Sequence, residues 1–129
     1  RETTALAREI RVAQLIHLAE TSDEVTGWLR TTGQRPGRWL ADQNVLDVPT
    51  VAAHCVHISE EEMEILRRAN VGIIHNPTSN LKLASGFAPV AQMLARRLHL
   101  GLGTDGCASN NDLDMLKKCA WQHCCQKLS

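Results

Sequence analysis

The chain has 129 residues, and its 14 Lys and Arg side chains balance its 14 Asp and Glu side chains, which excludes a strongly basic nucleic-acid-binding protein. Hydrophobic residues make up 43% and charged residues 22%, so the chain is neither disordered nor fibrous. No apolar run approaches the roughly 18 residues that a membrane span requires. We therefore expect a soluble, cytoplasmic protein with one core, and neither nucleic acid nor a membrane as its partner.

The first half of the chain alternates short apolar runs with longer amphipathic stretches, a pattern typical of βα units. It predicts, in chain order, the end of a helix at 1–10, a buried strand at 12–18, a helix at 21–33, a short helix at 35–43 and a strand at 50–56. Thr21 and Glu24 form a capping-box pattern at the start of the second helix, and Gly33 ends it.

The second half continues the same alternation. It predicts a helix at 59–70, a strand at 71–75, a turn at 76–80 with a loop to residue 86, a short helix at 88–96, a strand at 98–102, a loop at 103–106 and a helix at 112–127. Ser59 and Glu62 form a second capping-box pattern. Pro77 favours the turn because proline donates no hydrogen bond to a strand ladder.

Each predicted strand ends in side chains that are costly to bury and useful in catalysis. In chain order they are His17 with Glu20, His54, His75 with Asn76, and Asp105. The carboxyl ends of parallel barrel strands open onto one face, so these residues can converge on one pocket. Two imidazoles and a carboxylate, with Glu20 beside them, supply the ligand types and the general acid or base of a zinc hydrolase.

Taken singly, each histidine has a structural interpretation, because a buried histidine is more often hydrogen-bonded within the core than bound to a ligand. His57, just past its strand, and His99, inside the last strand, are expected to be structural. His75 fits either interpretation, since it can simply pack beneath the turn that follows.

Four segments together resemble successive signatures of the amidohydrolase superfamily, in the order in which that family carries them. They are His17-Leu18-Ala19-Glu20-Thr21, Ala53-His54-Cys55-Val56-His57, the run from His75 to Gly86, and the run from Gly103 to Asn111. Within the superfamily the chain is most similar to the branch of metal-dependent deaminases and chlorohydrolases, which includes the 5-methylthioadenosine/S-adenosylhomocysteine deaminase group.

The resemblance implies hydrolytic deamination of a purine nucleoside derivative and one divalent metal ion, Zn²⁺ rather than Fe²⁺. His17 would be a zinc ligand, and Glu20 would shuttle protons and bind the purine ring. His54 would polarise the attacking water or the intermediate and contact substrate. Asp105 would contact the metal and act as the general base.

The remaining polar residues of these segments are assigned structural roles by the same resemblance. Asn76, Ser79 and Asn80 would shape the loop after the third strand, and Ser109 and Asn110 would fix the loop after Asp105. The catalytic set expected from the sequence is therefore Glu20, His54 and Asp105.

The resemblance covers about residues 5–115, which match strands five to eight of the family's (β/α)₈ barrel. A complete barrel needs about 200 to 250 residues, and the family's His-x-His pair does not occur in this sequence. We therefore expect one partial catalytic domain, residues 1–129, with the fold of a half barrel, and we expect the isolated chain to be inactive. Exposed sheet edges would favour homo-oligomers.

Three alternatives stay open. The parent enzyme can be a triazine chlorohydrolase or a guanine-type deaminase of the same superfamily, or the chain can be a non-catalytic half-barrel assembly module. A small doubly wound α/β domain that binds an anion or a nucleotide is disfavoured, because the segment 101–106 lacks the G-x-G-x-x-G spacing and the lysine of a phosphate-binding loop.

The cysteines indicate free thiols rather than disulfides, because the five of them are an odd number at irregular spacing. They are Cys55, Cys107, Cys119, Cys124 and Cys125. A zinc site formed by the last three with His123 is disfavoured, since no second pair of ligands accompanies them.

Overall fold

The computed structural model describes residues 2–111 and 113–117. Its elements are α1 (Glu2–Ile10), β1 (Gln14–Leu18), α2 (Ser22–Thr32), α3 (Pro36–Asp42), the 3₁₀ helix η1 (Val45–Asp47), β2 (Thr50–His54), α4 (Glu60–Arg68), β3 (Gly72–His75), α5 (Pro77–Lys82), α6 (Val90–Ala95), β4 (His99–Leu102) and α7 (Cys107–Asn110). Within those residues, no helix combines the length and the apolar character needed to cross a membrane. Most of the predicted helix over 112–127, with Cys119, His123, Cys124 and Cys125, lies outside the described residues.

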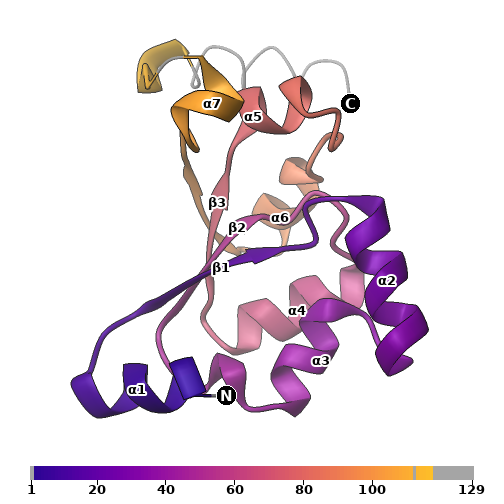
Figure 1. The fold of residues 1–129 in the computed structure, drawn as a ribbon, viewed down its shortest axis with the longest axis vertical. Helices are drawn as coiled ribbons and strands as arrows, with labels where there is room; N and C mark the ends of the chain where they lie inside the picture. Colours follow the sequence, from indigo (N-terminus) through magenta and orange to yellow (C-terminus); the bar gives the residue numbers. More distant parts are fainter. Residues whose placement is uncertain (1, 112, 118–129) are drawn as a thin grey trace.

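The four strands form one parallel sheet in the order β1-β2-β3-β4, with helices in the crossovers (Figure 1). This confirms the α/β class and the four βα units predicted from the sequence. The strands begin and end within two residues of the predicted bounds, because strand ends are where the apolar runs give way to polar residues. Neighbours in sequence are neighbours in the sheet, as in one half of a βα barrel.

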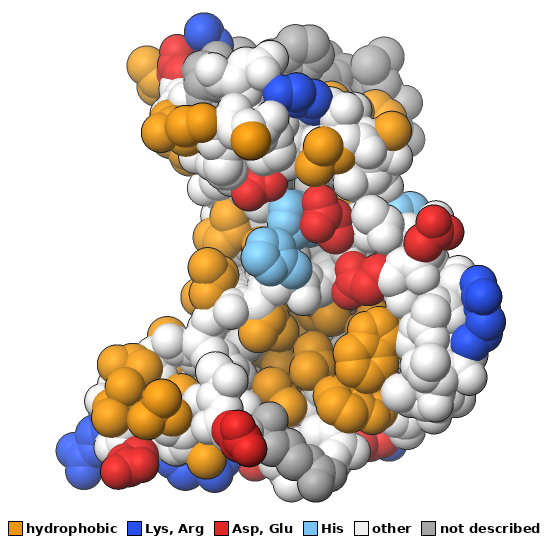
Figure 2. Space-filling model, viewed as in Figure 1, with side chains coloured by type: hydrophobic (Ala, Val, Ile, Leu, Met, Phe, Trp, Pro, Cys, Tyr) orange, Lys and Arg blue, Asp and Glu red, His pale blue; other side chains and the backbone are white. Residues whose placement is uncertain are grey.

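The two faces of the sheet differ in their surroundings. Ile16, Ala52, Ile73 and Leu100 form one cross-strand row, which packs into the core with Leu66 and other side chains of the helical layer. The next row, on the opposite face, consists of His17, Ala53, Ile74 and Gly101. Leu15 also lies on that face and is 70% exposed. Figure 2 shows this side as a hollow with an apolar floor and with histidine and acidic side chains along one rim.

The start of α4 forms the predicted capping box, which builds a buried polar cluster. Glu62 is 1% exposed and accepts hydrogen bonds from the Ser59 amide (2.9 Å), the Gly37 amide (2.9 Å) and Arg35 Nε (2.7 Å). Arg35 also donates to the His57 carbonyl. The cluster thus joins α3, α4 and the segment that follows β2.

The predicted turn and loop over 76–86 is wrong for its first part, because residues 77–82 form the helix α5. Pro77 takes the first helical position, where its missing N–H costs nothing and its fixed φ suits a helix. The helix α7, over residues 107–110, was likewise expected as loop. Lys82 at the end of α5 donates to the Ala108 carbonyl (2.8 Å), so the two short helices lie side by side above the strand ends (Figure 1).

Candidate active site

The histidines that end β1 and β2 lie against each other. The rings of His17 and His54 are stacked, with their centroids 5.3 Å apart and their planes 21° apart. The parallel register that pairs His17 with Ala53 and Leu18 with His54 produces this contact. His17 is exposed on the open face of the sheet, whereas His54 is 1% exposed.

Each ring nitrogen of His54 has a distinct environment. Nδ1 lies 2.8 Å from Asn80 Oδ1 on α5. Nε2 lies 3.7 Å from Glu20 Oε2 and has no hydrogen-bond partner among the described residues. The imidazole is therefore anchored at one nitrogen, and the other remains available on the side of Glu20.

The backbone before Glu20 is held by Glu24, which corrects part of the predicted capping box. Thr21 Oγ1 accepts from the Glu24 amide (3.2 Å), as predicted. The Glu24 carboxylate, however, accepts from the amides of Ala19 (2.9 Å) and Glu20 (2.8 Å). Ala19 has a left-handed backbone (φ 49°), which turns the chain so that these two amides meet the Glu24 carboxylate near the start of α2. Sequence spacing alone does not show this second role of Glu24.

Asp105, three residues after β4, is engaged at both carboxylate oxygens. Ser79 Oγ donates to Oδ2 (2.5 Å) and the Gly106 amide donates to Oδ1 (2.8 Å). The Ser79 hydrogen bond is the main reason why the pKa of Asp105 lies below its usual value; burial opposes the shift, and the Gly106 amide, Ser109 and the charge of His54 add to it. Asp105 is therefore kept as a carboxylate within electrostatic reach of His54.

We expect Ser79→Ala to raise the pKa of Asp105, because the donor that most stabilises the carboxylate is lost. Because the pKa of Asp105 is lower in the folded than in the unfolded chain, its carboxylate stabilises the fold at pH values above the unfolded pKa of about 3.9. This contribution to the free energy of unfolding is lost as the pH falls through the folded pKa. The variant should therefore lose less stability on acidification. Carboxyl ¹³C titration measures the shift, with Asp42, held by Arg38 and Gln34, as an internal control. An unchanged pKa of Asp105 would contradict the expectation.

The backbone is left-handed at several of these positions although none is glycine. The φ angles are 49° at Ala19, 74° at His54, 49° at Cys55 and 61° at Asp105. Each such residue costs on the order of 1–3 kcal/mol, and such strain concentrates at functional sites. The same conformation also occurs at turns away from this edge, for example at Arg11, Asn44 and Asn70, so here it shapes the chain where it leaves the strands and is not by itself a sign of function.

His75 and Asn76 lie at the end of β3, and both are buried. The Gly103 amide donates to the His75 carbonyl (2.9 Å). A side chain at Gly103 would clash with Asn76 Oδ1 and lie 2.6 Å from Ile74 Cγ2, so glycine permits this close approach. The packing of Asn76 against the end of β4 supports the structural role expected for it.

His57 and His99 have partners or surroundings other than the candidate catalytic residues. His57 Nε2 lies 2.7 Å from the Ser85 carbonyl, which matches the structural role predicted for His57. His99 begins β4 and, with Thr50 and Gly72, lines a pocket of about 530 Å³ at the amino ends of the strands. It is therefore at the opposite end of the sheet from His17 and His54.

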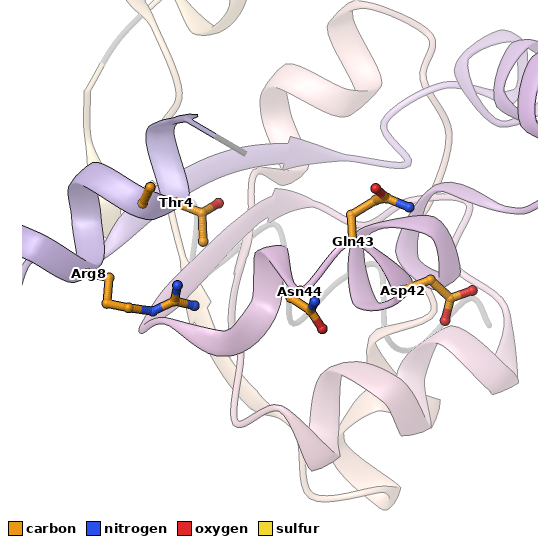
Figure 3. A pocket seen from close by; sticks show the side chains of 6 residues that line it. Thr4, Arg8, Asp42, Gln43 and Asn44 are labelled. Carbon is orange, nitrogen blue, oxygen red and sulfur yellow. The ribbon is translucent and has the colours of Figure 1, made fainter.

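A further pocket of about 400 Å³ lies between α1 and the end of α3 (Figure 3). It is lined by Thr4, Ala5, Arg8, Asp42, Gln43 and Asn44. It contains none of the predicted site residues. The chemistry expected from the sequence is thus confined to the carboxyl ends of the strands.

The donor atoms of this edge fit part of a zinc coordination sphere. His17 offers an imidazole nitrogen and Asp105 offers carboxylate oxygens, two ligand types that zinc prefers, and the ring of His54, whose buried Nε2 has no hydrogen-bond partner within the described part of the chain, stacks on His17. Among residues 2–111 and 113–117, no three His, Cys, Asp or Glu side chains are grouped so as to hold a metal ion. A catalytic zinc site usually takes three protein ligands, so His17 and Asp105 would be two of them.

Residues 1–128 match the sequence family described as the amidohydrolase family. The chain is 51% identical over 118 residues to a 5-methylthioadenosine/S-adenosylhomocysteine deaminase of Thermoanaerobacter pseudethanolicus. It is 47% identical over 117 residues to a 5'-deoxyadenosine deaminase of Methanococcus vannielii. These matches cover 92% and 90% of this chain but only 27% and 28% of the relatives, so the chain spans about a quarter of their length.

Solved structures with the same fold include three hydrolases. A zinc-bound adenosine deaminase from Xanthomonas campestris superposes with a TM-score of 0.83 at 38% identity, over 88% of this chain and 26% of that one. A guanine deaminase from C. acetobutylicum with bound guanine gives 0.83 at 29% identity, over 96% and 32%. The zinc complex of the atrazine chlorohydrolase TrzN from Arthrobacter aurescens TC1 gives 0.78 at 27% identity, over 85% and 24%.

Proposed function

Because this chain belongs to the amidohydrolase family, we propose that it forms part of the active site of a metal-dependent deaminase that hydrolyses a purine nucleoside derivative of the methylthioadenosine or adenosylhomocysteine type. The observation that supports the proposal is the stacking of His17 on His54 at two neighbouring strand ends, with Glu20 3.7 Å from His54 Nε2 and Asp105 within electrostatic reach of His54. The reaction converts a ring C–NH₂ group and water into C=O and ammonia.

His17 and Asp105 would hold the metal ion, which we propose to be zinc. When bound, zinc would act as a Lewis acid that lowers the pKa of a water molecule to roughly 7. The lowered pKa of Asp105 keeps it ionised, so that its carboxylate can take a proton from the attacking water and pass it to the leaving ammonia. Asp105 is therefore both a ligand and the general base.

Glu20 and His54 would act on the substrate side of the pocket. The carboxylate of Glu20, which lies 3.7 Å from His54 Nε2, would exchange a proton with a ring nitrogen of the purine. His54 Nε2 would accept a hydrogen bond from the attacking water and so orient it. Glu24 fixes the main chain at Glu20, and Asn80 holds the imidazole ring of His54 at Nδ1.

The same residues would serve a guanine-type deaminase or a triazine chlorohydrolase, since the chain shares its fold with one enzyme of each kind. The higher identity to the methylthioadenosine/adenosylhomocysteine deaminase favours the adenosine-type substrate. The cytoplasmic location expected from the sequence stays a prediction.

We also propose that copies of this chain associate through the edges of the sheet. A non-catalytic assembly module, the remaining alternative, would associate in the same way. β1 and β4 are the edge strands of the described sheet, and Leu15 on β1 is 70% exposed. Unpaired strand edges and exposed apolar side chains favour self-association. The mass of the chain in solution tests this part.

The activity is tested by replacing the matched 118 residues of the Thermoanaerobacter pseudethanolicus relative with the corresponding residues of this chain. We expect the chimera to bind zinc and to release ammonia from methylthioadenosine, because the strand-end residues are supplied by this chain. His17→Ala should lower the zinc content, while Arg8→Ala, on α1, should not. A folded, zinc-loaded chimera that releases no ammonia would overturn the proposal, and turnover of guanine or a chlorotriazine instead would favour an alternative.

A further inference from the structure

Two adjacent residues of α5 reach from one short helix to two of the candidate catalytic groups. Ser79 and Asn80 are both 0% exposed. Ser79 Oγ donates to Asp105 Oδ2 after β4, and Asn80 Oδ1 lies 2.8 Å from His54 Nδ1 at the end of β2. The helix therefore bridges the ends of two strands that are not neighbours in the sheet.

The position of α5 is fixed by its own backbone and by α7. The backbone amide of Asn80 donates to the backbone carbonyl of Asn76 (3.0 Å), and the backbone amide of Ser85 donates to the backbone carbonyl of Asn80 (2.8 Å). Lys82 Nζ donates to the Ala108 carbonyl (2.8 Å) and to Asn111 Oδ1 (2.5 Å) on the α7 side. A side chain held on such a support can orient its partner more narrowly than one on a free loop.

The contact of Asn80 determines which nitrogen of His54 carries the proton. An amide oxygen only accepts hydrogen bonds, so the neutral imidazole must donate from Nδ1 and leave a lone pair on Nε2. Nε2 has no hydrogen-bond partner among the described residues and lies on the side of Glu20. The opposite tautomer would place a proton on Nε2 and remove the acceptor that a water molecule needs there.

We propose that Asn80 is a positioning residue that holds His54 in its Nδ1–H tautomer, while its neighbour Ser79 orients the Asp105 carboxylate. The catalytic meaning of this inference rests on the proposed function, but the tautomer itself is a property of this chain alone. The sequence pattern assigned both residues only to the shape of a loop. The structure assigns each of them to one reacting group.

The test is ¹⁵N NMR of the histidine side chains in the full chain, labelled with ¹⁵N, at a pH about two units above the ordinary histidine pKa of roughly 6.5. The chemical shifts of the two ring nitrogens report which of them is protonated. We expect His54 to show a protonated Nδ1 and an unprotonated Nε2. A dominant Nε2–H tautomer in the unmodified chain would overturn the proposal without any variant.

Three variants separate positioning from mere packing. Asn80→Ala should move His54 from a dominant Nδ1–H form to a mixture dominated by Nε2–H, the form preferred by a free imidazole. Asn80→Asp keeps an oxygen acceptor and should restore Nδ1–H. Thr78→Val, on the same helix, should leave the tautomer unchanged, because no hydrogen bond holds the buried Thr78 hydroxyl among the described residues. Failure of Asn80→Asp to restore the tautomer would contradict the inference.

The outcomes distinguish this inference from the proposed function. If NMR shows the Nδ1–H tautomer in this chain but the chimera releases no ammonia, Asn80 still positions His54 and the proposed deaminase function is refuted. An active chimera with His54 in the Nε2–H form would refute the role of Asn80 alone. In the active chimera, Asn80→Ala should lower kcat with little change in KM, and Asn80→Asp should recover part of the loss.

Discussion

Replacing Glu62 with alanine is expected to lower the free energy of unfolding by about 3–5 kcal/mol, the range found when one partner of a buried ion pair is removed. Glu62 is 1% exposed and accepts from Arg35 Nε and from the amides of Gly37 and Ser59. The variant leaves all three donors without their acceptor, and a guanidinium without its counter-charge. Urea unfolding measures the change.

The matched control is Glu64→Ala, on the same helix. Glu64 bonds Arg67 (2.8 Å) and Arg68 (2.7 Å), which lower its pKa to about 2, but all three side chains are exposed to solvent. Exposed ion pairs stabilise proteins little, so the unfolding midpoint should hardly move. Equal effects of the Glu62 and Glu64 variants would show that the buried cluster does not hold α3 and α4 together.

The Glu62 cluster also bears on the site, because Arg35 donates to the carbonyl of His57. That carbonyl lies three residues after His54, in the segment that turns away from β2 through left-handed residues. A residue far from the reacting groups in sequence thus supports the backbone that places His54. The capping residue Glu62 therefore stabilises the start of α4 and, through Arg35, also supports the segment next to the candidate site.

The fold was largely predictable because its signals are local and periodic. Runs such as 12–18 and 50–56 are apolar, end in polar residues and alternate with amphipathic stretches, and the structure places strands at Gln14–Leu18 and Thr50–His54. The helix α5 was not predicted, since Asn-Pro followed by Ser and Asn suits a turn as well as a helix start. The tertiary contacts of Ser79 and Asn80 favour the helix.

The positions of the candidate site residues at strand ends could be predicted, but not their contacts. His17, His54 and Asp105 were identified by their positions at strand ends, and the parallel order of the strands brings those ends together. The chain is left-handed at Ala19, His54 and Asp105; Asp and His adopt this conformation more often than most residues, but neither requires it, and Ala seldom adopts it. The contacts of Asn80 with His54 and of Ser79 with Asp105 join residues 26 positions apart, so the local sequence pattern could not reveal them.

We expect Asp105→Asn, in the chimera that carries this chain, to lower kcat for ammonia release by about 10²–10⁴-fold at saturating zinc, the usual contribution of a general base. The amide is nearly the same size as the carboxylate, and its single oxygen can accept from Ser79 or from the Gly106 amide, which donate to different oxygens of Asp105. It cannot take a proton from water at neutral pH. Steady-state kinetics with the zinc content measured in parallel separates loss of the base from loss of the metal.

Asp42→Asn is the matched control, because Asp42 is also an aspartate with a lowered pKa but lies on α3 beside Arg38 and Gln34, in the pocket of Figure 3. Its substitution should leave kcat unchanged. If Asp105→Asn retains activity within a few-fold of the parent chimera at equal zinc content, Asp105 does not accept the proton, and Glu20, beside His54 Nε2, becomes the candidate base. A parallel loss of zinc and activity would instead identify Asp105 chiefly as a ligand.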